Sequence, residues 1–254
     1  MAVSTFAEPI PAATLVVFRD CPTGPAELLI VERARAMTFA GGALVFPGGR
    51  IDPEDFSLGQ IHSPDDVHGP ARIAAIRETI EEAGIPVGLS PLPTPAQLAA
   101  LREGLHAGEP FGALLHAHGL TINFTALVPF ARWCPQHPNM RIFDTSFFLA
   151  ALPAGSPVPV VDQTENTRVF WASAQHVLDD ADAGKVSIIF PTRRNLERLA
   201  LHNSFADAVD DAGRHEFRMV TPWTESRDGI DYLCIPDDLG YPVSAEPMTR
   251  AMRG

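Results

Sequence analysis

The chain has 254 residues, enough for one large domain, and its 19 Lys and Arg against 31 Asp and Glu give a net charge of −12. Because nucleic acids and anionic membrane surfaces repel such a charge, a general binder of either kind is excluded. Three widely spaced cysteines form neither a disulfide framework nor a metal spacing, and no apolar run reaches the roughly 18 to 20 residues of a membrane helix. We therefore expect a cytoplasmic protein without nucleic-acid or membrane partners.

The first segments read as a hairpin followed by a glycine-rich turn. Apolar runs at 13–18 and 27–31 flank a Pro/Gly-rich turn, which predicts two paired strands. The run Ala43–Phe46 leads into Pro-Gly-Gly at 47–49 and predicts a strand that ends in a tight turn.

Residues 70–83 predict a helix with unusually clear ends. Pro70 suits the first turn, and Gly84 follows directly after the last turn. The apolar residues of this segment recur at helical spacing and form one stripe: Ile73, Ile76 and Ile80. A helix anchored in the core by this stripe presents its acidic residues on the opposite side.

The rest of the chain alternates helical and extended patterns. A helical elaboration of about 96–118 contains two predicted helices, near 97–106 and 111–118. The segments that follow predict, in order, strands at 121–133, 143–151 and 168–171 and helices at 173–183 and 192–202. A C-terminal extension of about 204–254 predicts a helix at 205–211 and strands at 217–221 and 230–235. Without an internal repeat or a clear linker, we expect a single domain over 1–254.

The sharpest motif is a group of acids in the predicted helix 70–83. Glu78, Glu81 and Glu82 stand at i, i+3 and i+4, so one helical turn carries three carboxylates. Hard divalent cations prefer several oxygen ligands, and Mg²⁺ is often completed by substrate phosphates. The alternative is a solvated acidic face with a weak Arg77–Glu81 pair. The fixed spacing and the upstream glycine turn favour a metal site.

The motif resembles the Nudix box, which reads Gly, five residues, Glu, seven residues, Arg-Glu-apolar-x-Glu-Glu-x-Gly-apolar. Its second half matches at Arg77–Ile85, with Thr79 where the family prefers an apolar residue. Its first half matches at Gly49 and at Asp55, an acid in place of Glu. The box therefore spans 49–85 and carries an insertion at about 56–69.

The interrupted box is similar to that of one branch of the family, the coenzyme A diphosphatases of the mammalian peroxisomal type and their bacterial relatives. The stretches 33–52, 132–135 and 143–148 also resemble this branch, and Glu165 stands where the branch tends to place a Glu. The resemblance implies an α/β fold, the Nudix α/β/α sandwich around a mixed sheet, here with a helical insertion and a C-terminal extension.

The resemblance also implies roles for individual residues. The ligands of Mg²⁺ or Mn²⁺ would be Glu78, Glu81 and Glu82. One of the three would also orient or deprotonate the attacking water, Arg77 would orient a carboxylate of the box, and the backbone at Gly48 and Gly49 would let a carbonyl approach the metal. Which Glu is the base, and whether Asp55 or Glu165 takes part, stays open.

The activity implied is metal-dependent hydrolysis of the diphosphate in coenzyme A or acyl-coenzyme A, giving 3′,5′-ADP and a phosphopantetheine. One alternative is the same chemistry on ADP-ribose, a dinucleotide or a nucleotide sugar. Another is a catalytically silent module that senses a nucleotide, although a pure sensor has no need of the full acidic cluster. The expected partner is a small-molecule diphosphate, and many proteins of the family form homodimers.

Several other residues are candidates for phosphate binding or for a gate. Arg33 and Arg35 follow the predicted hairpin and are either phosphate ligands or solvated edge residues. The insertion 56–69 is either a lid over the site or a surface loop. Three arginines of the predicted helix 192–202 could meet an anion, but an exposed helix face is the favoured interpretation for Arg193, Arg194 and Arg198.

Overall fold

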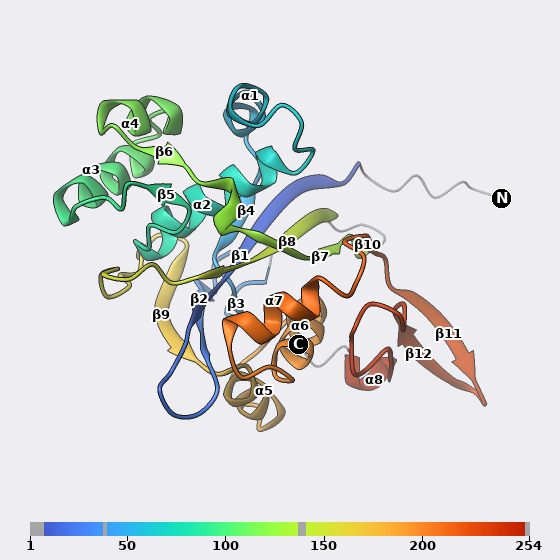
Figure 1. The fold of residues 1–254 in the computed structure, drawn as a ribbon. Coiled ribbons are helices and arrows are strands. Elements are labelled where there is room, and N and C mark those ends of the chain that lie inside the picture. Colours follow the sequence, from blue (N-terminus) through green and yellow to red (C-terminus); the bar gives the residue numbers. More distant parts are fainter. Residues whose placement is uncertain (1–7, 38–39, 137–140, 252–254) are drawn as a thin grey trace.

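The computed structural model describes residues 8–37, 40–136 and 141–251 (Figure 1). Its centre is an eight-stranded sheet in which β1 (Ile10–Arg19) pairs antiparallel with β2 (Glu27–Arg33) and β4 (Gly48–Arg50) and parallel with β8 (Phe143–Ala151). The other strands flank β2 or lie beyond β8: β3 (Leu44–Val45), β9 (Asn166–Ala172), β7 (Val128–Trp133) and β10 (Met219–Val220). The expected hairpin and mixed sheet are confirmed.

Helices cover both faces of this sheet, because its central strands are apolar on both sides. In β1, Ala13, Leu15 and Val17 belong to one core, whereas Val16 and Phe18 belong to a second core on the other face. The first face is covered by α1 (Pro53–His62), α2 (Gly69–Ala83), α3 (Pro95–His106) and α4 (Phe111–Ala117). The second is covered by α5 (Ala174–Asp182), α6 (Phe190–Leu199) and α7 (Phe205–Ala212) (Figure 1). The α/β/α sandwich is confirmed.

Helix α2 has the ends that its sequence predicts. It begins at Gly69, with Pro70 in its first turn, and Gly84 closes it in the left-handed conformation at φ 66°. The predicted apolar stripe is fully buried: Ile73, Ile76 and Ile80. The stripe packs α2 onto the sheet and thereby determines where its acidic residues lie.

The insertion in the box is part of the helical layer. Asp55, Leu58 and Gly59 of α1 are buried, and a Cβ at Gly59 would lie only 2.8 Å from the ring of Pro70 in α2. The Glu54 carboxylate accepts hydrogen bonds from the first two backbone N–H groups of α4, at 2.9 and 3.1 Å. Residues 53–62 are therefore a packed helix, and the surface-loop interpretation is wrong for them. A role as a lid stays a prediction.

The segment 121–133 is divided, contrary to the prediction of one strand. Its first residues form β6 (Thr121–Ile122), which pairs with β5 (Leu89–Ser90), and a 3₁₀ turn over Phe124–Ala126 precedes β7. The Asn123 N–H donates to the carbonyl of Gly88 at 2.8 Å, so this part of the segment pairs beside β5 and not with the large sheet.

The C-terminal extension is an ordered part of the second face. After α7 and β10 it forms a separate three-stranded sheet, whose β11–β12 ribbon projects from the body in Figure 1. The elements of this sheet and the helix after it are β11 (Trp223–Arg227), β12 (Ile230–Cys234), β13 (Ala245–Pro247) and α8 (Met248–Ala251). Over the described ranges, no helix is long and apolar enough to cross a membrane.

The extension buries two arginines of α6, so the prediction that they lie on an exposed face is wrong. Arg194 and Arg198 are each only 1 % exposed. Arg194 pairs with Glu246 at 3.1 Å, and Arg198 donates to Asp211 at 2.8 Å. The Arg198 guanidinium also stacks over Phe130, with 4.3 Å from its carbon to the ring centroid. Segments far away in the sequence supply these partners, which a local helical pattern does not show.

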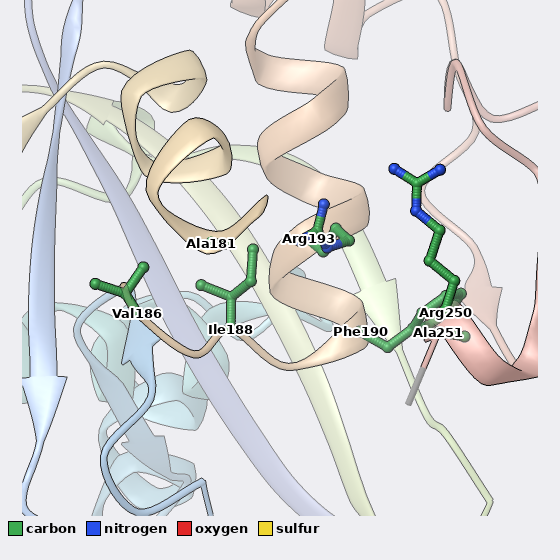
Figure 2. A pocket seen from close by; sticks show the side chains of 7 residues that line it. All are labelled: Ala181, Val186, Ile188, Phe190, Arg193, Arg250 and Ala251. Carbon is green, nitrogen blue, oxygen red and sulfur yellow. The ribbon is translucent and has the colours of Figure 1, made fainter. Parts of the chain in front are cut away.

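A small cavity on the second face is distinct from the acidic cluster (Figure 2). It has a volume of about 20 Å³ and is lined by apolar side chains of 181–190 together with Arg193 and Arg250. Both arginines are paired with acids, Arg193 with Asp182 at 2.9 Å and Arg250 with Glu246 at 3.1 Å. A cavity of this size cannot take a nucleotide.

The burial of Arg198 predicts a large stability effect. We expect Arg198→Met to cost about 3–5 kcal/mol in the free energy of unfolding, because Asp211 loses its guanidinium partner in a buried setting. Urea denaturation measures the change. Lys185→Met removes the exposed Lys185–Asp180 pair and should leave the curve unchanged. Equal curves for the two variants would contradict the interpretation.

Candidate active site

Glu78 and Glu82 of α2 face Gly48 and Gly49, which form strand β4 and not the tight turn that the sequence predicts. The Glu82 carboxylate accepts a hydrogen bond from the Gly48 N–H at 3.0 Å. An added Cβ on Gly49 would lie 2.4 Å from the carboxyl carbon of Glu78, so only glycine lets β4 approach the helix this closely. Glu81 is one third exposed and lies at the outer side of this cluster.

The Arg77 guanidinium contacts two acids of the cluster, Glu78 and Glu81. It donates to the Glu78 carboxylate at 2.8 Å, to Asp55 at 2.9 and 3.3 Å, and to the Arg50 carbonyl at 3.0 Å. Glu81 lies 3.7 Å away from the same guanidinium. Asp55 is therefore the partner of Arg77 and not a member of the carboxylate cluster. The two are brought together although the insertion separates them in the box.

The protein environment makes the charged form of these acids unfavourable. Burial raises the pKa of Glu78 above its ordinary value, and the nearby Arg77 only partly opposes this. Burial also raises the pKa of Glu82, and the charge of Glu78 raises it further. The pKa of Glu81 is raised by burial as well. A cation between these groups would relieve both the burial cost and the mutual repulsion.

The donor chemistry of the cluster fits a divalent metal ion. Carboxylate oxygens are the ligands that Mg²⁺ and Mn²⁺ prefer, and Glu78, Glu81 and Glu82 carry more negative charge than Arg77 balances. Across the described residues, no three His, Cys, Asp or Glu side chains are already gathered around one metal position. Oxygens of Glu78 and Glu81 face Arg77, and an oxygen of Glu82 faces the Gly48 N–H.

Thr79 fits the apolar position that it occupies in the motif. It is fully buried, and its hydroxyl donates to the Ala75 carbonyl at 2.7 Å. The hydroxyl is therefore satisfied within α2, so that the side chain packs like an apolar residue.

The loop before β9 faces the cluster and brings Glu165 close to it. The charge of Glu165 raises the pKa of both Glu78 and Glu81, and the charge of Asp162 contributes at Glu81. The Glu165 side chain is 59 % exposed, and its carboxylate lies 3.8 Å from Arg33. Glu165 thus lies near the predicted metal site, on the side of Glu78 and Glu81.

The two candidate phosphate-binding arginines differ in environment. The Arg33 side chain is 15 % exposed and lies at the end of β2, toward the acidic cluster. Arg35 is exposed in the loop that follows β2. Asp162 and Asn166 also lie near the site, although no sequence motif indicates them, because their position depends on the pairing of β9 with β2.

Comparisons with known proteins identify relatives in sequence and in fold. No family model matches the chain. It is 25 % identical to the acyl-coenzyme A diphosphatase NUDT19 of Gallus gallus over 73 % of this chain and 65 % of the relative. For the Homo sapiens protein of the same name, identity is 26 % over 74 % of this chain and 64 % of the relative. The chain thus spans slightly less than two thirds of these relatives.

A solved structure gives the same result at the level of the fold. The NUDIX hydrolase from Alicyclobacillus acidocaldarius is 28 % identical and superposes with a TM-score of 0.69, covering 81 % of this chain and 97 % of that one. The chain is a protein of the Nudix hydrolase fold with the acidic helix in place. In sequence it resembles the acyl-coenzyme A diphosphatase branch of that family.

The burial of Glu82 predicts a stability effect that is opposite to its effect on metal binding. A carboxyl whose pKa is raised by folding costs stability once the pH exceeds its ordinary value. We therefore expect Glu82→Gln to stabilise the metal-free protein by about 1 kcal/mol or more at pH 8, since one pKa unit corresponds to about 1.4 kcal/mol. The gain should vanish near pH 4, where the carboxyl is protonated in both states.

Thermal unfolding in the presence of a chelator, with and without later addition of Mn²⁺, measures both effects. Glu82→Gln should also lose the rise in Tm that Mn²⁺ gives to the wild type. The matched control is Glu103→Gln, at an exposed position of α3. A destabilised Glu82→Gln protein at pH 8 would contradict the argument.

The close approach of Gly49 predicts that a single methyl group disturbs the site. Gly49→Ala should push the Glu78 carboxylate aside and raise the Kd for Mn²⁺ on the order of tenfold. Gly213→Ala is the control, because an added Cβ there meets no atom nearer than 3.6 Å. Isothermal titration with Mn²⁺ compares the affinities of the two variants, and equal affinities would show that β4 does not support Glu78.

Proposed function

We propose that this chain is a divalent-metal-dependent diphosphatase that hydrolyses coenzyme A or acyl-coenzyme A to 3′,5′-ADP and a phosphopantetheine. The observation that carries the proposal is the placement of half-buried Glu78 and buried Glu82 on one turn of α2 against Gly48 and Gly49. The charged form of both carboxyls is unfavourable in the folded protein, and binding of Mg²⁺ or Mn²⁺ together with a diphosphate would offset this free-energy cost.

The residues of the site have separate tasks in this proposal. The ion would be held by Glu78, Glu81 and Glu82, and when bound it would neutralise diphosphate charge and acidify a water. Arg77 keeps Glu78 and Glu81 oriented and stays away from substrate, because its 9 % exposed guanidinium is bonded to Asp55. Glu165, outside the box, is the most exposed acid beside the cluster and can accept a proton from the attacking water.

Coenzyme A differs from the alternative substrates by its 3′-phosphate and its pantetheine arm. Arg33 ends β2 beside the acidic cluster, Arg35 is exposed in the loop after it, and both would supply guanidinium groups for phosphate oxygens. The names of the NUDT19 relatives favour coenzyme A over ADP-ribose, a dinucleotide or a nucleotide sugar. A cytoplasmic location and a homodimer are further parts of the proposal.

Product analysis tests the activity directly. Purified protein with Mg²⁺ or Mn²⁺ is incubated separately with coenzyme A, acetyl-coenzyme A, ADP-ribose and a dinucleotide, and the products are separated by chromatography. We expect 3′,5′-ADP from both coenzyme A species, with a loss on the order of 100-fold or more in Glu82→Gln and none in Glu103→Gln. Cleavage of only the other substrates would keep a diphosphatase and reject coenzyme A. Binding without any cleavage would favour the sensor.

A further inference from the structure

Asn166, the first residue of β9, has a buried side-chain amide without hydrogen-bond partners. The residue is 1 % exposed, and neither its Nδ2 nor its Oδ1 makes a hydrogen bond of normal geometry. Its backbone N–H donates to Asp162 at 3.1 Å, so the residue is held in place. An unsatisfied buried polar group costs about 1–3 kcal/mol. Such a group in a folded protein calls for an explanation.

A β-bulge turns this amide toward the acidic cluster. From Leu28 to Glu32 the residues of β2 pair one for one with β9, but Arg33 then pairs with Asn166 and Thr167 is skipped. Because side chains alternate between the faces of a strand, the extra residue places Asn166 on the face of α2. Without the bulge it would point toward the opposite layer of helices.

The neighbours of Asn166 on this face are complementary to an amide. The Glu82 carboxylate is one of them, and Asn166 lowers its pKa. Arg33, the cross-strand partner, is the other, and its Nε is also buried without a hydrogen-bond partner. Directly opposite residues of paired strands have Cβ atoms about 5 Å apart. In space, the Asn166 amide therefore lies between a donor, Arg33, and an acceptor, Glu82.

We propose that Asn166 is a positioning residue that orients Glu82 for metal binding. In this role its Nδ2 would donate to the Glu82 carboxylate and its Oδ1 would accept from Arg33 Nε, three buried atoms and groups that lie close together, while the Gly48 N–H already donates to Glu82 at 3.0 Å. The inference rests on the proposed function, because it assigns a task within the same site. Asn166 is too buried to meet substrate and acts through Glu82.

Two substitutions that are isosteric with each other test this role. Asn166→Val removes the amide, whereas Asn166→Thr has nearly the same shape but keeps a hydroxyl donor, and both residues suit a strand. Electron paramagnetic resonance measures the Mn²⁺ affinity of metal-free protein, and thermal unfolding records stability. We expect Val to raise the Kd for Mn²⁺ about tenfold or more, and Thr to raise it less.

A matched control and the contrary outcomes separate this role from simple packing. Asn203→Val makes the same exchange at an exposed position after α6 and should change neither quantity. Wild-type affinity in Asn166→Val would overturn the inference, and so would equal losses in Val and Thr that follow a common fall in Tm. If the wild type neither binds Mn²⁺ nor cleaves a diphosphate, the proposed function itself fails.

Discussion

The candidate site depends on one buried guanidinium. Arg77 is 8 % exposed and connects the inserted helix through Asp55, its own helix through Glu78, and strand β4 through the Arg50 carbonyl. A buried cation that loses its partners costs several kcal/mol, so these contacts keep three elements in register. The insertion can therefore lengthen the box without separating its ends, because Asp55 returns to Arg77 at 2.9 Å.

The acids that would bind the metal ion lower the stability of the metal-free protein. Without a metal ion, desolvation and mutual repulsion make the charged forms of Glu78 and Glu82 unfavourable, in agreement with the raised pKa of each carboxyl. The apolar stripe of α2, with Ile73, Ile76 and Ile80 fully buried, offsets this cost and holds the acids where they lie. Binding sites commonly carry such a local cost, because groups arranged for a ligand are not arranged for stability.

The second face of the sheet is stabilised by different means. There the C-terminal extension supplies acids to buried arginines of α6, with Asp211 for Arg198 and Glu246 for Arg194. These pairs lie on the opposite side of the sheet from the carboxylates, so the two faces can be perturbed separately. The two faces share the central strands, in which alternate residues of β1 belong to alternate cores.

The sequence by itself determined the features that depend on neighbouring residues. Pro70 and Gly84 delimit α2 to within one residue, and the spacing of Glu78, Glu81 and Glu82 places three carboxylates on one turn, because helix geometry is local. Only the tertiary structure decided that Asp55 meets Arg77, that Arg198 is buried, and that a bulge turns Asn166 toward Glu82. Each of these depends on a partner distant in the chain, and strand register and helix packing select that partner.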